Sequence, residues 1–204
     1  MSWKKTLVSE AKKLIDMYPE KRSALGPLLY LALREEGYIS NEAMREISTL
    51  IGITESQVQS VATFYSMYKQ EPVGRYLISV CKSVSCEISG SSVVNKALME
   101  ATNLNHLESD EDGIFTIEQV ECIGACGGAP AIQINYETIE NIQEGKVSEL
   151  CSWLEKEQPK VINSDEIQNK FGGRKSFDWG IQDNSGTTGP YPGFQVYKTT
   201  GERS

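Results

Sequence analysis

Four cysteines stand in two short loops, and each loop follows an apolar run with the composition of a β-strand. The first pair follows residues 75–80 and the second pair follows residues 114–120. Two strands that deliver four thiols in short loops can bring them to one small inorganic centre. The cysteines are Cys81, Cys86, Cys122 and Cys126. We expect the rest of the chain to position this centre or to provide surface for a partner.

The spacing within each pair separates the chemistries that cysteines perform. Four residues lie inside the first pair and three inside the second, so neither pair has the C-x₂-C form. Structural zinc sites commonly use this pattern, and a dithiol redox site requires one such pair. A [2Fe–2S] cluster is a larger object held by four thiolates, and it suits wider loops. The spacing therefore favours a [2Fe–2S] cluster. A zinc-stabilised interaction module stays the alternative because the metal is not encoded uniquely, and a dithiol oxidoreductase is the weakest interpretation.

Glycines surround the second pair of cysteines, at Gly124, Gly127 and Gly128. Small residues let backbone N–H groups approach the sulfur atoms, which stabilises an anionic cluster. Glycine also permits the positive φ that a loop needs where it wraps tightly. We expect all three glycines to serve these purposes.

Cys151 and His106 are the other residues whose types suit chemistry. Cys151 shares a helical face with Val147, Leu150 and Leu154, which is typical of a small apolar core residue. His106 lies in a polar run that predicts a surface loop. One histidine cannot complete a Ser/His/Asp or Cys/His set, and no glycine-rich phosphate loop is present. We expect no catalytic residue on this chain.

Composition narrows the class of protein. Twenty basic and 28 acidic side chains give a formal net charge of −8, which argues against nucleic-acid binding. No apolar run approaches the ~20 residues that span a bilayer, and the first residues lack the apolar part of a secretory signal. Five cysteines without a signal favour metal or redox work over disulfides. We expect a cytoplasmic protein without direct membrane insertion.

Residues 1–70 show the periodicity of four short amphipathic helices. Gly37 can end the second helix, and Ser40 or Asn41 can cap the third. The fourth begins with a capping box at Thr54. Brief connections between such helices predict a small bundle used for packing and docking.

Residues 71–158 change to an alternation of strands and helices. An amphipathic helix is predicted between the two strands that precede the cysteine pairs. Residues 131–135 can form a hairpin with residues 137–142. A closing helix follows near residues 147–154. This order predicts an α/β domain with a mixed sheet covered by helices.

Residues 159–204 are rich in glycine and also contain scattered aromatic residues. A purely disordered tail would be poorer in aromatics. We interpret this segment as an extended C-terminal arm that becomes ordered on a partner surface; a frayed tail is the alternative.

Three motifs resemble a known family. They are Thr63-Phe-Tyr65, Pro72 to Cys81 with Cys86, and Glu121 to Pro130. Over residues 5–156 the chain resembles the thioredoxin-like [2Fe–2S] subunit of the complex I NADH dehydrogenase module. This is the 24 kDa subunit family, which also contains the small subunits of NAD-linked hydrogenases and formate dehydrogenases. The resemblance implies an α+β fold, with a helical bundle followed by a thioredoxin-like domain.

The resemblance also implies a site and partners. It places the four ligands of one [2Fe–2S] cluster on Cys81, Cys86, Cys122 and Cys126. It implies an electron carrier inside NADH:quinone oxidoreductase, paired with a subunit that carries FMN and binds NADH, and accompanied by larger iron–sulfur subunits. The complex would hold the chain peripherally on the inner face of the cell membrane. The equivalent subunit of an NAD-linked hydrogenase or formate dehydrogenase is the closest alternative.

Overall fold

The computed structural model describes residues 3–176, 186, 187 and 189. The chain divides into two compact units, and the change between them falls at Pro72 and Val73. The first unit is helical, and the second contains the sheet.

The first unit confirms the expected helical bundle. Its elements are α1 (Lys5–Asp16), the 3₁₀ helix η1 (Lys21–Ala24), α2 (Leu25–Glu36), α3 (Asn41–Ile51) and α4 (Glu55–Phe64). Leucine, isoleucine and alanine side chains from these helices form one buried core. Three helix ends follow the sequence closely. Gly37 takes a left-handed conformation after α2, Ser40 accepts a hydrogen bond from the Ala43 N–H, and Thr54 forms a capping box with Gln57.

The second unit confirms the mixed sheet. Its strands are β1 (Tyr76–Cys81), β2 (Phe115–Val120), β3 (Ile132–Ile134) and β4 (Glu137–Ile139). Its helices are α5 (Val84–Ile88), α6 (Ser91–Thr102), the 3₁₀ helix η2 (Cys126–Gly128), α7 (Glu144–Glu157) and α8 (Ser164–Phe171). The strand order is β2-β1-β3-β4. β1 runs parallel to β2 and antiparallel to β3, and β3 runs antiparallel to β4.

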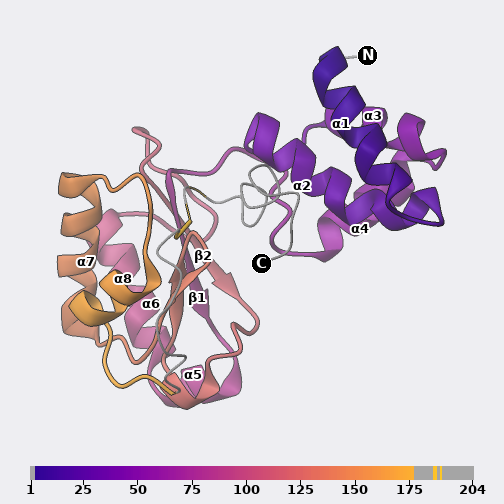
Figure 1. The fold of residues 1–204 in the computed structure, drawn as a ribbon. Coiled ribbons are helices and arrows are strands. Elements are labelled where there is room, and N and C mark those ends of the chain that lie inside the picture. The colour runs from indigo at the N-terminus through magenta and orange to yellow at the C-terminus, as the bar shows by residue number, and fades with distance from the viewer. Residues whose placement is uncertain (1–2, 177–185, 188, 190–204) are drawn as a thin grey trace. The chain divides into compact units, whose positions relative to one another are not determined.

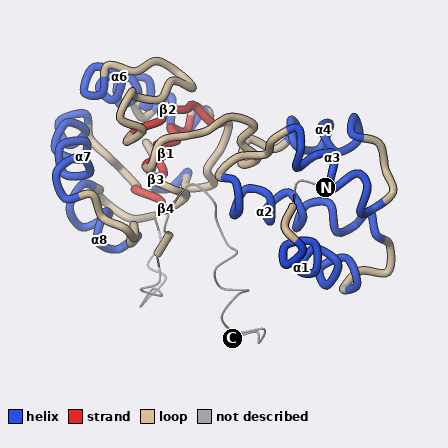
Figure 2. The backbone as a smooth tube through the Cα atoms, turned by 90° about the horizontal axis from the view of Figure 1, so that it is seen from above, coloured by secondary structure: helices blue, strands red, loops and turns tan. Residues whose placement is uncertain are grey.

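Helices α6, α7 and α8 lie together on one face of the sheet (Figures 1 and 2). Alternate strand residues point into the core between them, as the period of a strand requires. Tyr76, Ile78 and Val80 of β1 belong to this core, together with residues of all three helices. The intervening residues Leu77 and Ser79 are buried as well, and β1 is one of the two inner strands of the sheet, with β3.

Two α-helices of the described residues were not expected from the sequence. Helix α5, five residues long, begins within the first cysteine loop, contains Cys86 and ends at Ile88. It is too short to show a helical period. Helix α8 lies in the segment expected to be an extended arm. Asn163 caps it by accepting hydrogen bonds from the Asp165 and Glu166 N–H groups, and Ile167 is completely buried.

The rest of the expected arm falls mainly outside the described residues. These are residues 177–185, 188 and 190–204, so an arm there stays a prediction. Near them, Ile162 and Thr187 exchange two backbone hydrogen bonds of 2.8 and 2.9 Å.

A two-residue turn, Asn135-Tyr136, joins β3 to β4. Both residues have positive φ, of 49° and 73°, which is the pattern of a type I′ hairpin turn. The Asn135 side chain also accepts a hydrogen bond from the Leu77 N–H (2.9 Å) and donates one to the Arg75 carbonyl (3.0 Å). One buried asparagine therefore fixes the hairpin against the start of β1.

We predict that Asn135→Ala lowers the free energy of unfolding by about 3 kcal/mol, because two main-chain groups lose their partner. Urea denaturation followed by circular dichroism measures this. Asn169→Ala, on the exposed side of α8, is the matched control and should stay within about 0.5 kcal/mol. Equal stability of the two variants would contradict the role assigned to Asn135.

Candidate functional site

The parallel pairing of β1 and β2 brings the two cysteine loops to the same edge of the sheet. In the register of this pair, Cys81 lies opposite Val120, and both are the last residues of their strands. The Lys82 N–H donates to the Val120 carbonyl at 2.9 Å, which extends the pairing by one step. Cys122 follows only two residues after Val120. The loops that carry Cys86 and Cys126 therefore start next to each other.

The chain returning from the second loop packs against the end of β1. The Cys81 N–H donates to the Ala131 carbonyl at 3.2 Å, just before β3 begins. Cys81, Cys86 and Ala131 form a small buried cluster of their own. Ile123, Ala125 and Ala129, which flank the second pair of cysteines, pack against it. The second loop thus folds back over the first.

The four thiols differ in exposure. Cys81 and Cys86 are both 2% exposed, whereas Cys122 and Cys126 are exposed, and none forms a disulfide. Burial raises the pKa of the Cys86 thiol to about 11, and the adjacent Cys81 thiol adds to this. Cys126 is also near enough to Cys86 to interact with it electrostatically. The structure therefore brings Cys81 and Cys86 together in one buried cluster and leaves Cys122 and Cys126 exposed on the adjoining loop.

The four thiols are not arranged as ligands of one metal ion. Within residues 3–176, no three His, Cys, Asp or Glu side chains are grouped as ligands of one metal ion. A [2Fe–2S] cluster has a different requirement, because its four thiolates are shared between two irons. The donor set, four reduced thiols on two adjoining loops, fits that requirement.

An ion pair connects the two loops at the surface. Lys82 Nζ lies 2.8 Å from Glu121 Oε1, and each residue neighbours a cysteine of its own loop. Both side chains are well exposed, so the pair contributes little to stability. Cys81 adds a weak contact across the same gap, since its thiol lies 3.9 Å from the Glu121 carbonyl.

Glycine is needed in the second loop for two different reasons, backbone conformation and space. Gly124 has a φ of 89°, as the sequence predicted. Gly127 and Gly128 do not have positive φ, so that expectation was wrong for them. They are needed for space. A Cβ on Gly127 would lie 2.7 Å from the Ser176 Cβ, and one on Gly128 would overlap the Glu140 side chain.

The residues that support this loop were missed by sequence reasoning. Asn141 donates from its backbone N–H to the Gly128 carbonyl at 2.6 Å and from its side chain to the Ala129 carbonyl at 3.1 Å. Next to the loop lies a cavity of about 330 Å³, lined by Ile123 and Gly124 together with hairpin and α8 residues. Most of these supports are far from the loop in the chain, so no local pattern could reveal all of them.

The other two candidates lie where the sequence placed them. His106 is exposed and its Nδ1 accepts a hydrogen bond from the Gln119 N–H at 3.1 Å. Cys151 is 5% exposed on α7 and belongs to the core with Val147, Leu150 and Leu154.

The structure also bears on membrane insertion. Across the described part of the chain, no helix is long and apolar enough to cross a membrane.

A mixed sheet with helices on one face and cysteine loops at one edge defines a thioredoxin-like protein with a thiol site. The sequence model of one family, described as thioredoxin-like [2Fe-2S] ferredoxin, matches residues 11–155. The chain belongs to this family.

Curated relatives match about two thirds or more of the chain. The chain is 36% identical over 152 residues to an NADH-quinone oxidoreductase subunit of Mycobacterium tuberculosis, covering 74% of this chain and 60% of the relative. It is 37% identical to an NADH-quinone oxidoreductase subunit of Thermus thermophilus, covering 66% of this chain and 75% of the relative. The match therefore spans about three fifths of the mycobacterial protein.

Solved structures show the same fold. An NAD⁺-reducing [NiFe]-hydrogenase in the H₂-reduced state matches with a TM-score of 0.58 at 20% identity. The match covers 71% of this chain and 24% of the hydrogenase chain. At this identity the similarity concerns the fold alone.

We predict that Cys151 resists alkylation at pH 8, although Cys122 and Cys126 react. Burial raises the pKa of Cys151 to about 12, so about one molecule in ten thousand carries the thiolate at pH 8. Iodoacetamide labelling of the iron-free protein, read by peptide mass spectrometry, measures the rates. Labelling in urea is the control and should make all five cysteines react. Fast native labelling of Cys151 would show that α7 does not bury it.

Proposed function

We propose that this chain is the [2Fe–2S] electron-transfer subunit of the NADH dehydrogenase module of NADH:quinone oxidoreductase. One observation carries the proposal: the parallel pairing of β1 with β2 brings the two cysteine loops to one edge of the sheet, where Ile123 and Ala125 of the second loop pack against the first pair of cysteines. Because the chain belongs to a family of [2Fe–2S] ferredoxins, we interpret the thiols of these loops as ligands of a [2Fe–2S] cluster. The names of the mycobacterial and Thermus relatives support the choice of complex.

The four thiols of Cys81, Cys86, Cys122 and Cys126 are the ligands in this proposal. A bound [2Fe–2S] cluster takes up and releases single electrons. The protein surrounds the two halves of the site differently. The buried pair, with Ala131 packed against it, excludes water from one side. The exposed pair stands at the surface, where a partner can bring its own redox group close.

The partner in this proposal carries FMN and binds NADH. The sequence of this chain has neither a dinucleotide fingerprint nor a Walker lysine, so its own part is to accept an electron, not a hydride. Larger iron–sulfur subunits would complete the module. The complex would hold the chain on the cytoplasmic face of the cell membrane without any span of its own.

A second candidate is the equivalent subunit of an NAD-linked hydrogenase or formate dehydrogenase. The fold similarity to the NAD⁺-reducing [NiFe]-hydrogenase favours it. The full set of chains in the complex purified from its natural source separates the two candidates. Quinone-binding and membrane subunits support the first, and a hydrogenase or formate dehydrogenase subunit supports the second.

We predict that alanine at any one of the four cysteines lowers the iron content below the about two atoms per chain expected of the unaltered protein. Each substitution removes one thiolate of the set. Anaerobic purification with iron, sulfide and zinc counted, and with EPR of the dithionite-reduced protein, measures the loss. Cys151→Ala is the matched control and should keep both irons. Iron loss in that control, or one zinc and no iron in the unaltered chain, would contradict the ligand assignment.

We also propose that the C-terminal arm predicted over residues 159–204 contributes, through its last residues, to association with the flavin-carrying subunit. Removing residues 190–204 should raise the Kd for that subunit about tenfold, which equals about 1.4 kcal/mol. Titration of the purified subunits by calorimetry measures this. Unchanged iron content in the truncated chain is the control for folding. An equal Kd for both chains would remove the docking role.

A further inference from the structure

The segment that follows α7 reaches back to the loop of Cys122 and Cys126. We name residues 163–176, which comprise α8 and its continuation, the C-terminal clamp. The family model ends its match at residue 155, so the C-terminal clamp lies outside the matched region. The family match therefore does not cover the residues through which the C-terminal clamp approaches the cysteine loop.

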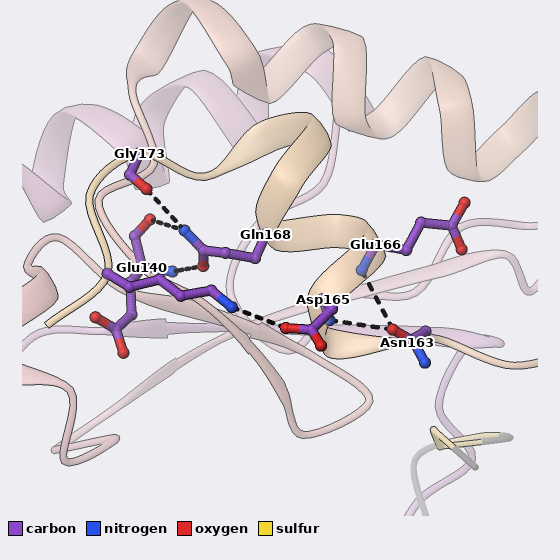
Figure 3. A network of polar contacts seen from close by, with 7 residues as sticks. Glu140, Asn163, Asp165, Glu166, Gln168 and Gly173 are labelled. Carbon is purple, nitrogen blue, oxygen red and sulfur yellow. Dashed lines mark hydrogen bonds and ion pairs between the residues drawn. The ribbon is translucent and has the colours of Figure 1, made fainter. Parts of the chain in front are cut away.

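Gln168 is the centre of the C-terminal clamp, as Figure 3 shows. Its side chain is buried, with the residue 4% exposed, and it makes three hydrogen bonds. Its Oε1 accepts from the Glu140 N–H at 2.7 Å, and its Nε2 donates to the Glu140 carbonyl at 3.1 Å and to the Gly173 carbonyl at 3.0 Å. Buried amides that use their donors and acceptors in this way fix the position of what they bind.

Glu140 is held from a second side by the end of the C-terminal clamp. The Gly173 N–H donates to the Glu140 carbonyl at 3.0 Å, and the Ser176 N–H donates to the Glu140 carboxylate. Lys175 pairs with Asp165 at 2.8 Å, which ties this end back to the start of α8. Residues 172–176 therefore pass around Glu140 from the backbone to the carboxylate.

Glu140 and its neighbour Asn141 transmit this hold to the cysteine loop. Asn141 donates to the carbonyls of Gly128 and Ala129, shortly after Cys126. Glu140 and Ser176 also fill the space that side chains at Gly128 and Gly127 would need. The loop is thus hydrogen-bonded by Asn141 and closely packed by Glu140 and Ser176, and Gln168 bonds the backbone of Glu140.

We propose that Gln168 and Glu140 are positioning residues that hold the Cys122–Cys126 loop in the shape that retains the cluster. The inference rests on the proposed [2Fe–2S] function. The hydrogen bonds of both residues run to main-chain groups of residues 140, 173 and 176. They reach the cysteine loop through Asn141, the neighbour of Glu140, which bonds the carbonyls of Gly128 and Ala129, and not through a thiol. Groups that hydrogen-bond directly to metal ligands are worth roughly 10- to 100-fold in metal affinity, and for residues that act on the loop backbone we expect the lower end of this range.

Four variants of the chain test this proposal. Gln168→Leu removes all three hydrogen bonds at similar volume, and Glu140→Ala removes the carboxylate that Ser176 binds. Glu140→Gln keeps an acceptor for the Ser176 N–H and should behave as the unaltered protein. Phe171→Leu is the matched control, because Phe171 packs α8 against Trp153 at the core and takes no part in the hydrogen bonds to Glu140.

Two measurements apply to each variant. The first is the rate at which the reconstituted protein loses iron to a chelator, which should rise on the order of tenfold in Gln168→Leu and Glu140→Ala. The second is amide hydrogen exchange over residues 122–130 of the iron-free protein, which should accelerate in the same two variants. Phe171→Leu should lower the melting temperature and leave both quantities unchanged.

The outcomes are distinguishable. Iron loss and exchange at unaltered rates in Gln168→Leu would overturn the positioning role. So would equal effects in Phe171→Leu, since general destabilisation would then explain them. An unaltered chain that takes up no iron would remove the proposed function, whereas exchange over residues 122–130 would still decide whether the C-terminal clamp holds the loop.

Discussion

The site depends on one constraint, the in-register parallel pairing of β1 with β2. Because both strands run in the same direction and end opposite each other, Cys81 and Val120 finish at one edge of the sheet. A parallel pair requires a crossover between its strands, and α6 provides it on the face of the core. A shift of this register by one residue would turn the side chain of Cys81 to the opposite face of the sheet. The site is thus a consequence of how the sheet is connected.

The two loops then solve different problems. The first places Cys86 on a short helix, α5, and buries it beside Cys81. Both thiols are 2% exposed and pack with Ala131, so this half of the site is ordered by burial. The second loop leaves Cys122 and Cys126 exposed and takes its order from glycines and from hydrogen bonds supplied by Asn141. One half is fixed by burial and the other by contacts from outside the loop.

Much of this organisation could be predicted from sequence because it is locally encoded. Helix caps at Ser40 and Thr54 and the apolar strand runs before Cys81 and Cys122 depend on neighbouring residues, and the structure confirms the elements they predicted. Helix α5 escaped prediction because so short a helix has no visible period. Helix α8 escaped because glycines on its C-terminal side dominated the composition of the segment. The assignment of the four ligands and the role of the last residues stay predictions.

The glycines of the second loop show most clearly where sequence reasoning stops. Gly124 has the left-handed backbone that glycine permits, but the sequence predicted the same backbone for Gly127 and Gly128, which do not have it. Gly127 and Gly128 need the absence of a side chain, and the reason lies at Ser176 and Glu140, which are distant in sequence. The sequence alone does not distinguish a glycine that is needed for its backbone conformation from one that is needed because a side chain would not fit.

The two kinds of glycine differ in what would relieve a substitution. Enlarging Gly128 is tolerated only if Glu140 moves, and Glu140 is bound at its N–H, its carbonyl and its carboxylate. Two of these three groups are held by the Gln168 side chain. The packing of the cysteine loop and the polar contacts of Gln168 are therefore one structural unit.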